Sequence, residues 1–279
     1  MNSTYDVRAS VVIYGNVESV TLQLISTLQK QVDLVVVVDN SPTQLSSHNQ
    51  SILPKSSKIL YQSLSHNPGY GAGHNFALQQ TTDSKNTVHF IMNPDVEIHD
   101  CFVNELLPYF ENPSVGVVMP FVVFPDGKAQ QLARRVPKPR DVIRRIMKPY
   151  FRLPDGSYEL GDLDWTQSNQ VPIVSGCCLA IRGSIVKHVG GFDERFFMYF
   201  EDYDLSRRAA SFCTVVAART PTIIHHHGNA SRQSAKMALI HLRSAARYFN
   251  KWGWFKDPER DRLNSQIGPY QINNGETNA

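Results

Sequence analysis

The first 120 residues alternate short β-branched runs with segments of helical length, and this alternation constrains the fold more than any other feature. A chain of this kind builds a largely parallel sheet with helices on both faces. In such sheets ligands bind beyond the carboxyl ends of the strands. We expect strands at residues 8–14, 33–39, 58–62, 87–92 and 115–119, and helices at 18–30, 71–82 and 100–112.

After residue 120 the alternation stops in a basic, Pro-rich excursion over 121–171. A second ordered block follows, with a strand near 177–182, the segment FDERFFMYFEDYDLSRRA (192–209) and a strand that ends in HHHG. We therefore predict one α/β domain over 1–230, with a small subdomain, then a basic amphipathic helix over 231–256 and a flexible tail over 257–279.

The net charge of +3 hides an uneven distribution of charge along the 279 residues. Residues 128–152 carry nine basic side chains and one acid, and residues 232–256 carry six basic side chains and no acid. Two basic patches on an otherwise acidic body argue against a uniformly basic nucleic-acid-binding coat, and they leave a local anionic partner open.

The sequence predicts a soluble protein of the cytoplasm. The segment MNSTYDVRAS lacks the features of a secretory signal, and no apolar run is long enough to span a bilayer. The four cysteines show no CxxC pair, so we expect free, buried thiols in a reducing compartment.

The glycine-rich loop HNPGYGAGHN (66–75) follows the third expected strand. Gly69, Gly71 and Gly73 would let the backbone of a helix start approach a phosphate or a base. A dinucleotide-binding loop is an alternative, with Asp95 about twenty residues on as the ribose-binding acid. The GxGxG spacing and His74 in place of a third glycine weaken that alternative. A turn that only packs helix against strand is the third interpretation.

The segment NPDVE (93–97) ends the fourth expected strand. A carboxylate there suits a divalent cation that bridges diphosphate oxygens, and an Asx turn explains the segment equally well. Three histidines end a later strand, where alternation would place His225 and His227 on one face and His226 on the other. A metal or diphosphate site and ordinary surface histidines are both open here.

Two carboxylates, Glu201 and Asp202, follow the aromatic run FFMYF and begin a helical pattern. Carboxylates at a helix start can simply cap it. A carboxylate beside aromatic walls and a second negative charge has a raised pKa, which suits a general base. Capping alone leaves the aromatic run unexplained.

The C-terminal basic helix ends in an aromatic group of Trp252, Trp254 and Phe255. Such a helix can pack on the domain with its charged face solvated. It can also lie on a membrane, with basic groups against anionic head groups and tryptophans at the interface. The two interpretations are compatible.

Together and in order, the segments ASVVIYGN, VVVVDNS, NPGYGAGHN, FIMNPDVEI, SGCCLAIRGSIVKHVGGFDERFFMYFEDYDLSRR and IIHHHGNAS resemble the family 2 inverting glycosyltransferases. They look most like the rhamnosyltransferase-like members that build O-antigen and other surface polysaccharides. The resemblance implies a Rossmann-like GT-A fold with a mostly parallel central sheet, a small acceptor-side subdomain and a C-terminal helix.

The resemblance also implies roles for individual residues. Asp39 matches the acid that binds the nucleotide base, and Asp95 matches the last acid of the DxD motif, which ligates Mg²⁺ or Mn²⁺. Asn93 stands where the first Asp is usual. Asp202 matches the general base, with Glu201 to tune it. The remaining residues expected at the site are Tyr14, Gly71, Asn75 and Asn93 for the donor nucleotide, and His225 and His227 for the metal or diphosphate.

We therefore expect an inverting transfer of a sugar, L-rhamnose from dTDP-rhamnose in the first place, to a glycan or lipid-linked acceptor. Another UDP- or dTDP-sugar is the second donor candidate. An NAD-dependent oxidoreductase and a non-catalytic sugar-binding relative are the distant alternatives. The expected partners are this donor, the acceptor and an anionic membrane surface on the inner face, with a homodimer as a further candidate and no nucleic acid.

Overall fold

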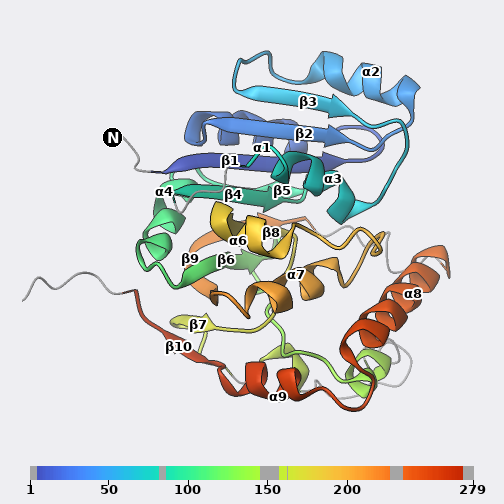
Figure 1. The fold of residues 1–279 in the computed structure, drawn as a ribbon. Coiled ribbons are helices and arrows are strands. Elements are labelled where there is room, and N and C mark those ends of the chain that lie inside the picture. Colours follow the sequence, from blue (N-terminus) through green and yellow to red (C-terminus); the bar gives the residue numbers. More distant parts are fainter. Residues whose placement is uncertain (1–4, 82–85, 145–156, 162, 227–234, 273–279) are drawn as a thin grey trace, which may run out of the picture.

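The structure is a computed structural model that describes residues 5–81, 86–144, 157–161, 163–226 and 235–272. Its strands form one sheet, which runs from the top to the bottom of Figure 1. The strand order is β3 (Ile59–Ser63), β2 (Leu34–Asp39), β1 (Asp6–Ile13), β4 (Thr87–Met92), β8 (Cys178–Arg182), β6 (Val115–Val123), β9 (Thr214–His225), β7 (Ser168–Gln170) and β10 (Gly268–Tyr270), with β5 (Val96–Glu97) beside β9.

The α/β class and the GT-A-like arrangement are confirmed, but the sheet is parallel only in part. Strands β3, β2, β1 and β4 are parallel, as their alternation with helices predicts. Strand β8 lies antiparallel between β4 and β6, because it enters the sheet at the edge where β4 ends and runs back from there. The whole sheet is therefore mixed, and the expectation of a mostly parallel sheet holds for its first half.

Helices cover both faces of the sheet. On one face lie α1 (Ser19–Gln31), α4 (Phe102–Leu106) and the 3-10 helix η1 (Leu107–Glu111). On the other face lie α3 (Tyr70–Leu78), α6 (Gly183–Val189) and α7 (Glu201–Ala209). In β2, Val35 and Val37 pack on the first face and Val36 and Val38 on the second, and all four are fully buried. A strand covered on both faces is the reason for this unbroken valine run.

Helix α2 (Thr43–Ile52) was not predicted from the sequence. Its segment TQLSSHNQSI is polar, and its buried side chains are Ser46 and Asn49. A helix that buries only polar side chains lacks the apolar periodicity from which a helix is predicted. The helix lies over β3 at one edge of the sheet (Figure 1).

The prediction of a flexible tail over 257–279 is wrong up to residue 272. After α8 (Ala235–Trp252) the chain forms α9 (Pro258–Ser265) and β10, which pairs with β7. Asp257 caps α9 by accepting a 3.1 Å hydrogen bond from the Arg260 amide, and Leu263 is buried. A short cap and one buried leucine make too weak a pattern to be seen in the sequence. Residues 273–279 lie outside the described part of the chain.

The basic excursion is more ordered than its composition suggests. Strand β6 extends through Val123, residues 139–144 are helical, and the 3-10 helix η2 spans Ser157–Glu159. Several of its side chains are buried, among them Ala133, Val136, Val142, Tyr158 and Leu160. Arg134 is also buried and donates to the backbone carbonyl of Ala133, so its charge does not contribute to a basic surface patch. Residues 145–156 and 162 are not described.

Among the described helices, none combines the length and the apolar character that crossing a bilayer requires.

Candidate active site

The residues predicted to act on a ligand converge at one edge of the sheet. Strands β1, β2 and β4 all end at this edge, and β8 begins there, because Met92 pairs with Cys178. Strand β9 also ends there, and its last residue, His225, pairs with Val96 of β5. The expected position of the site beyond the carboxyl ends of the strands therefore brings NPDVE and the first histidine together.

Asp95, Asn93 and His225 form one half of this site. The Oδ1 of Asp95 lies 3.4 Å from Nε2 of His225, and Nδ2 of Asn93 lies 3.3 Å from the same nitrogen. Nδ1 of His225 lies 3.0 Å from Oε1 of Gln130, whose Nε2 donates to the His225 carbonyl at 2.7 Å. In the tautomer that donates from Nδ1 to the Gln130 oxygen, Nε2 would direct its lone pair toward Asp95.

This arrangement fits a divalent cation. A carboxylate oxygen and an imidazole lone pair face each other, and the second imidazole nitrogen is oriented by an amide, as around bound metal ions generally. Over the described ranges, no three His, Cys, Asp or Glu side chains are close enough to hold a metal by themselves. Mg²⁺ commonly takes one or two protein carboxylates and completes its shell with phosphate and water. Asp95 and His225 would hold such an ion together with a diphosphate.

Asp202 and Gly176 form the other half. The Gly176 amide donates a 3.0 Å hydrogen bond to Oδ2 of Asp202, and the Tyr203 amide donates a 2.9 Å hydrogen bond to Oδ1. The side chain is only partly buried. A carboxylate that is oriented by backbone amides and still open to the site is suited to accept a proton from a substrate.

Glu201 is buried beside Asp202, and its Oε2 has no hydrogen-bond partner. Burial, followed by the neighbouring charge of Asp202, raises the pKa of Glu201 well above its usual range. The two residues before it, Tyr199 and Phe200, both have left-handed backbone conformations, with φ of 68° and 66°. Such conformations cost energy in residues with a Cβ, and they cluster at functional sites.

The segment 175–177 joins the two halves. The backbone N–H of Asn93 donates to the Cys177 carbonyl at 2.8 Å, and the backbone N–H of Gly176 holds Asp202. Burial raises the pKa of the Cys177 thiol to about 12, and the charges of Asp202 and Asp95 both add to this shift. Cys177 therefore lies near both carboxylates. Cys177 and Cys178 are free and buried as expected, whereas Cys101 is exposed and Cys213 is half-buried.

The glycine-rich loop has a packing role in this structure. A Cβ at Gly69, whose φ is +104°, would lie 2.2 Å from the Phe197 carbonyl oxygen, and a Cβ at Gly71 would lie 2.8 Å from Cβ of Phe192. Asn75 exchanges hydrogen bonds with the backbone N–H and carbonyl of Phe192, at 2.8 and 2.9 Å. Gly71 and Asn75 thus hold α3 against the segment that leads to Glu201, and their contact with a donor stays a prediction.

Asp39 ends β2 and is fully buried. Its oxygens accept from the Ser41 amide at 2.7 Å, from Asn49 Nδ2 at 2.8 Å and from the Tyr61 hydroxyl at 2.8 Å. Its binding of a base stays a prediction. Tyr14, at the end of β1, is exposed at the same edge of the sheet.

The three histidines do not act alike. His225 points into the site, whereas Nε2 of His226 lies 2.5 Å from Oε1 of Glu97 at the partly exposed end of β5. His227, which was expected beside His225, lies outside the described residues.

Sequence reasoning missed three residues of this site: Gln130, Gly176 and Tyr70. Gln130 lies in the basic excursion, 95 residues before the histidine that it orients, so no local pattern could reveal it. The Tyr70 hydroxyl donates a 2.6 Å hydrogen bond to the carbonyl of Gly176, the residue whose backbone N–H holds Asp202. The glycine in the segment SGCC could have suggested a backbone N–H available for a contact, but only the fold shows that this N–H donates to Asp202.

The chain resembles proteins of glycan synthesis. It is 30% identical over 185 residues to N-acetylglucosaminyl-diphospho-decaprenol L-rhamnosyltransferase of Mycobacterium tuberculosis, which covers 63% of this chain and 60% of that protein. It is 28% identical over 216 residues to the O-antigen biosynthesis protein RfbC of Myxococcus xanthus, which covers 76% of this chain and 16% of that protein. The chain thus spans less than two thirds of the length of these relatives.

Solved structures share the fold at low sequence identity. The structure of S. aureus TarS in complex with UDP-GlcNAc matches with a TM-score of 0.55 and 15% identity, over 93% of this chain and 70% of that one. GalNAc-T7 with UDP, GalNAc and Mn²⁺ matches with a TM-score of 0.56 and 12% identity, over 92% of this chain and 51% of that one.

The family model named glycosyl transferase family 2 matches residues 10–190, most of the chain. The matched range contains Asp39 and Asp95, and it ends before Glu201, Asp202 and His225. The matched range also contains strands β1, β2 and β4, whose carboxyl ends form the edge of the sheet where the candidate site lies. The chain belongs to glycosyl transferase family 2.

Proposed function

We propose that this protein transfers a sugar, with inversion, from a nucleotide-diphosphate donor to a hydroxyl group, and that Asp202 is the base. The main support for this proposal is the pair of hydrogen bonds made by the segment 175–177. The Cys177 carbonyl accepts from the backbone N–H of Asn93, and the backbone N–H of Gly176 donates to the Asp202 carboxylate. The base is thereby tied to the strand end that bears Asp95 at the proposed diphosphate site.

In the proposed mechanism Asp202 accepts the proton of the acceptor hydroxyl. The oxygen attacks the anomeric carbon while the bond to the diphosphate oxygen breaks, and the nucleoside diphosphate leaves with the bonding electrons. A divalent ion held by Asp95 and His225 would supply positive charge for the departing diphosphate. Gly176 keeps Asp202 oriented, and Gln130 keeps the His225 lone pair directed at the site. No covalent nucleophile is needed.

For the donor we propose dTDP-L-rhamnose, with another UDP- or dTDP-sugar second. Support comes from the relative named as an L-rhamnosyltransferase and from the neighbours solved with UDP or UDP-GlcNAc. For the acceptor we propose a glycan or a diphosphate-linked lipid, because the same relative is named for a decaprenol substrate. The proposed base-binding residues are Tyr14 and Asp39, with Asn93 beside the diphosphate.

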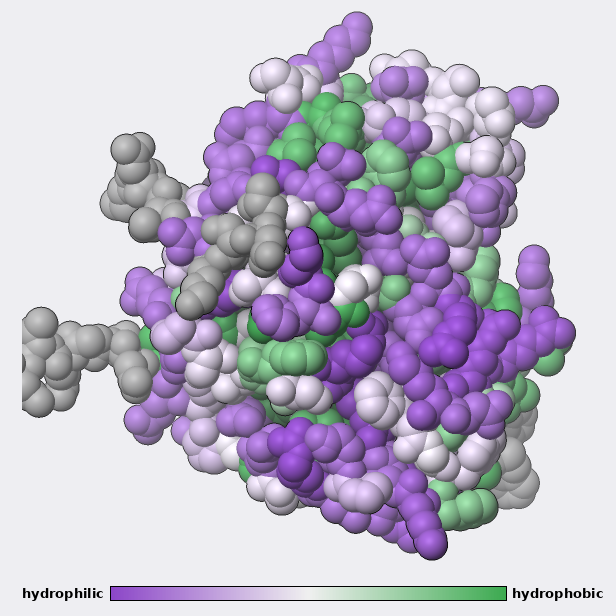
Figure 2. Space-filling model, viewed as in Figure 1, coloured by the Kyte–Doolittle hydropathy of each residue, from purple (hydrophilic) through white to green (hydrophobic). Residues whose placement is uncertain are grey.

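We further propose that α8 lies against the anionic inner face of a membrane. The exposed side of α8 carries Leu239 and Leu242 together with the basic Lys236 and Arg243, and Trp254, Phe255 and Lys256 follow its end. Phe255 is 91% exposed. Figure 2 shows strongly hydrophilic residues on the side of the molecule where α8 lies. Basic groups that surround isolated apolar side chains suit an interfacial helix.

The test of the transferase is Asp202→Asn, with the exposed Asp126→Asn as matched control. With dTDP-L-rhamnose and Mn²⁺, we expect Asp202→Asn to lose transfer at least about 10²-fold, the range typical of a removed general base. Its melting temperature and its stabilisation by the donor should stay those of the wild type. Transfer retained by Asp202→Asn would remove the assignment.

A donor screen by thermal shift, with and without Mn²⁺, tests the nucleotide, because a ligand that binds only the folded state raises the melting temperature. Stabilisation by dTDP and UDP sugars but not by NAD(H) is expected. Donor binding with neither transfer nor donor hydrolysis would instead favour a non-catalytic relative.

Liposome flotation tests the membrane surface. The protein should bind vesicles that contain phosphatidylglycerol at low salt and leave them at high salt. Leu239→Ser with Phe255→Ser should weaken this binding, whereas Phe212→Ser, at an exposed apolar residue elsewhere, should not. Equal binding of all three proteins would contradict the proposed surface.

A further inference from the structure

Helix α7, which begins with Glu201 and Asp202, continues with charged side chains that are buried. Asp204 and Arg207 are 0% and 1% exposed. Charged residues are seldom buried unless each has a specific partner. Most of the partners here come from the C-terminal part of the chain, which lies beyond the range that the family model matches.

Asp204 is held mainly by the end of α8. Its Oδ1 accepts from the Trp252 indole N–H at 2.9 Å and lies 2.7 Å from Nζ of Lys251. Its Oδ2 accepts from Nε of Arg208, one turn on in α7, at 2.8 Å. The carboxylate therefore joins the catalytic helix to α8 through both residues at the end of that helix.

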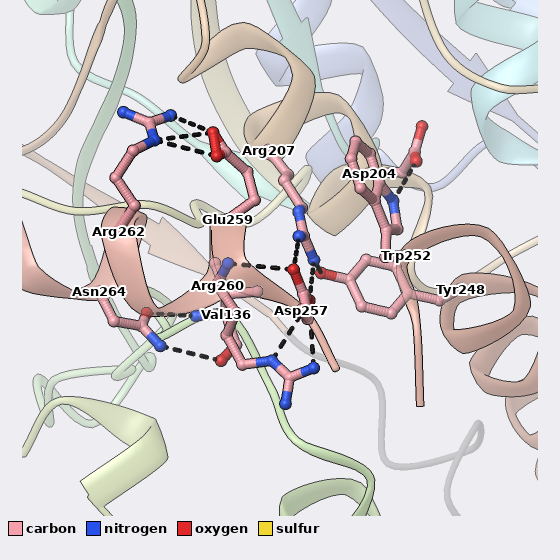
Figure 3. Close-up of polar contacts among 10 residues, drawn as sticks. All are labelled: Val136, Asp204, Arg207, Tyr248, Trp252, Asp257, Glu259, Arg260, Arg262 and Asn264. Atoms are coloured by element: carbon pink, nitrogen blue, oxygen red, sulfur yellow. Dashed lines mark hydrogen bonds and ion pairs between the residues drawn. The ribbon is translucent and has the colours of Figure 1, made fainter. Parts of the chain in front are cut away.

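Arg207 is held by the start of α9. Its guanidinium donates with both terminal nitrogens to Asp257, the residue that caps α9, and it lies over the Trp252 ring with Cζ 4.1 Å from the ring centroid. Asp257 also accepts from Nη2 of Arg260 at 3.1 Å. Figure 3 shows Asp204, Arg207, Trp252 and Asp257 drawn together from three helices.

The opposite face of α7 faces the segment that holds the base. Ser206 Oγ donates to the Val174 carbonyl at 3.3 Å, one turn along from Asp202 and its bond to Gly176. Helix α7 is therefore held on two sides, by residues 174–176 on one and by α8 and α9 on the other. The position of Asp202 depends on both contacts.

The segment before α7 is held by α8 as well. Lys251 Nζ donates to Asp193 at 2.8 Å, and Ser244 Oγ donates to the Met198 carbonyl at 2.7 Å. This segment contains Tyr199 and Phe200, whose left-handed backbone leads directly into Glu201. The strained entry to the catalytic helix is thus anchored to α8 at two points.

We propose that Asp257 and Lys251 are positioning residues that set the place of Asp202 through α7. This inference rests on the proposed function of Asp202. Buried ion pairs often contribute little net stability compared with apolar side chains of the same size. What they do provide is a fixed orientation, since a guanidinium and a carboxylate meet in one bidentate geometry. The C-terminal segment 235–265 would therefore be part of the catalytic unit.

The test uses the full chain with Asp257→Asn, Asp257→Glu and Lys251→Met, and with Glu259→Gln as control. Glu259 pairs with Arg262 in the same helix α9, but at the surface. The probes are dTDP-L-rhamnose with Mn²⁺, followed as release of dTDP, and hydrogen exchange of the α7 amides. All are measured well below each variant's melting temperature.

We expect Asp257→Asn and Lys251→Met to lower kcat about 10-fold or more with the donor KM within about twofold of wild type. Exchange of the α7 amides should rise in both. Asp257→Glu should recover part of the rate, and Glu259→Gln should match wild type. If Asp257→Asn does not fold, Lys251→Met carries the test.

Unchanged kcat in the folded variants overturns the positioning role, even where exchange rises, because the contacts would then be only structural. A parallel loss of kcat and donor binding overturns it too. If the wild type itself releases no dTDP, the proposed donor and function fail instead, and the exchange of α7 in Asp257→Asn still shows whether the C-terminal segment holds this helix.

Discussion

The backbone N–H of Gly176 and the carboxylate of Asp202 are 26 residues apart in the chain and 3.0 Å apart in the fold. A Cβ added to Gly176 would lie 3.3 Å from Cβ of Asp202 and 3.4 Å from Cε1 of Tyr70. The hydrogen bond and the close approach belong together, because only a residue without a side chain brings its amide this near to Asp202 without crowding.

Gly176→Ala should therefore lower the rate without unfolding the protein. The neighbours must yield by a few tenths of an ångström, and a small displacement of a reacting group costs about tenfold or more in kcat. The melting temperature should stay the same or rise slightly, since alanine reduces the freedom of the unfolded chain. Steady-state kinetics and a thermal melt measure both. Gly268→Ala, where the added Cβ meets nothing within 4 Å, is the control, and equal rates for both variants would contradict the prediction.

Gln130→Met should weaken the proposed metal site. The change removes the acceptor that orients Nδ1 of His225, and loss of such a partner typically costs about 10- to 100-fold in metal affinity. A titration of dTDP release against Mn²⁺ should show a higher half-saturating concentration, with kcat at saturating metal close to wild type. Gln131→Met changes the exposed neighbour and should leave the titration unchanged. An unaltered half-saturation in Gln130→Met would mean that this glutamine does not support the site.

Glu201→Gln should stabilise the protein at neutral and higher pH but not in acid. Burial, then the charge of Asp202, raises the pKa of Glu201 in the folded state. The unfolded chain therefore loses the proton first as the pH rises through about 4.5, and the free energy of unfolding of the wild type falls from there. Glutamine has no proton to lose.

The measurement for Glu201→Gln is the melting temperature from pH 4 to pH 8. The difference from wild type should be small at pH 4 and should grow with pH, at about 2–4 °C for each kcal/mol recovered. Glu18→Gln, at an exposed position, is the matched control. A difference that does not change with pH would show that Glu201 is not held in its neutral form by folding.

Asn75→Ala should destabilise the fold more than it affects the donor. The change removes the hydrogen bonds that Asn75 makes to the N–H and the carbonyl of buried Phe192. Each buried group left without a partner lowers the free energy of unfolding by roughly 1–3 kcal/mol. Urea unfolding should show a loss of about 3 kcal/mol, while donor affinity of the folded protein stays near wild type. The exposed Asn16→Ala should change neither. Full stability with lost donor binding would instead make Asn75 a donor ligand.

Some parts of this molecule could be predicted because their signal is local. The alternation of valine-rich strands with helices determines the α/β class, since each strand buried on both faces must be apolar throughout. The motif NPD and the pair Glu201–Asp202 stand at element ends, where ligands bind in sheets of this class. The polar helix α2, the antiparallel direction of β8 and the ordered segment 258–270 escaped prediction, because their stabilising contacts are with residues distant in the sequence.

The sequence by itself indicated the family, and it predicted the strand ends and the carboxylates Asp95 and Asp202 as the site. Only the tertiary structure decided which groups hold the predicted residues: Gln130 for His225, the Gly176 N–H for Asp202, and Asp257 and Lys251 for helix α7, which carries Asp202. The physical reason is that the chemistry of a side chain is fixed by the residue itself, whereas its orientation comes from hydrogen bonds between segments up to 132 residues apart.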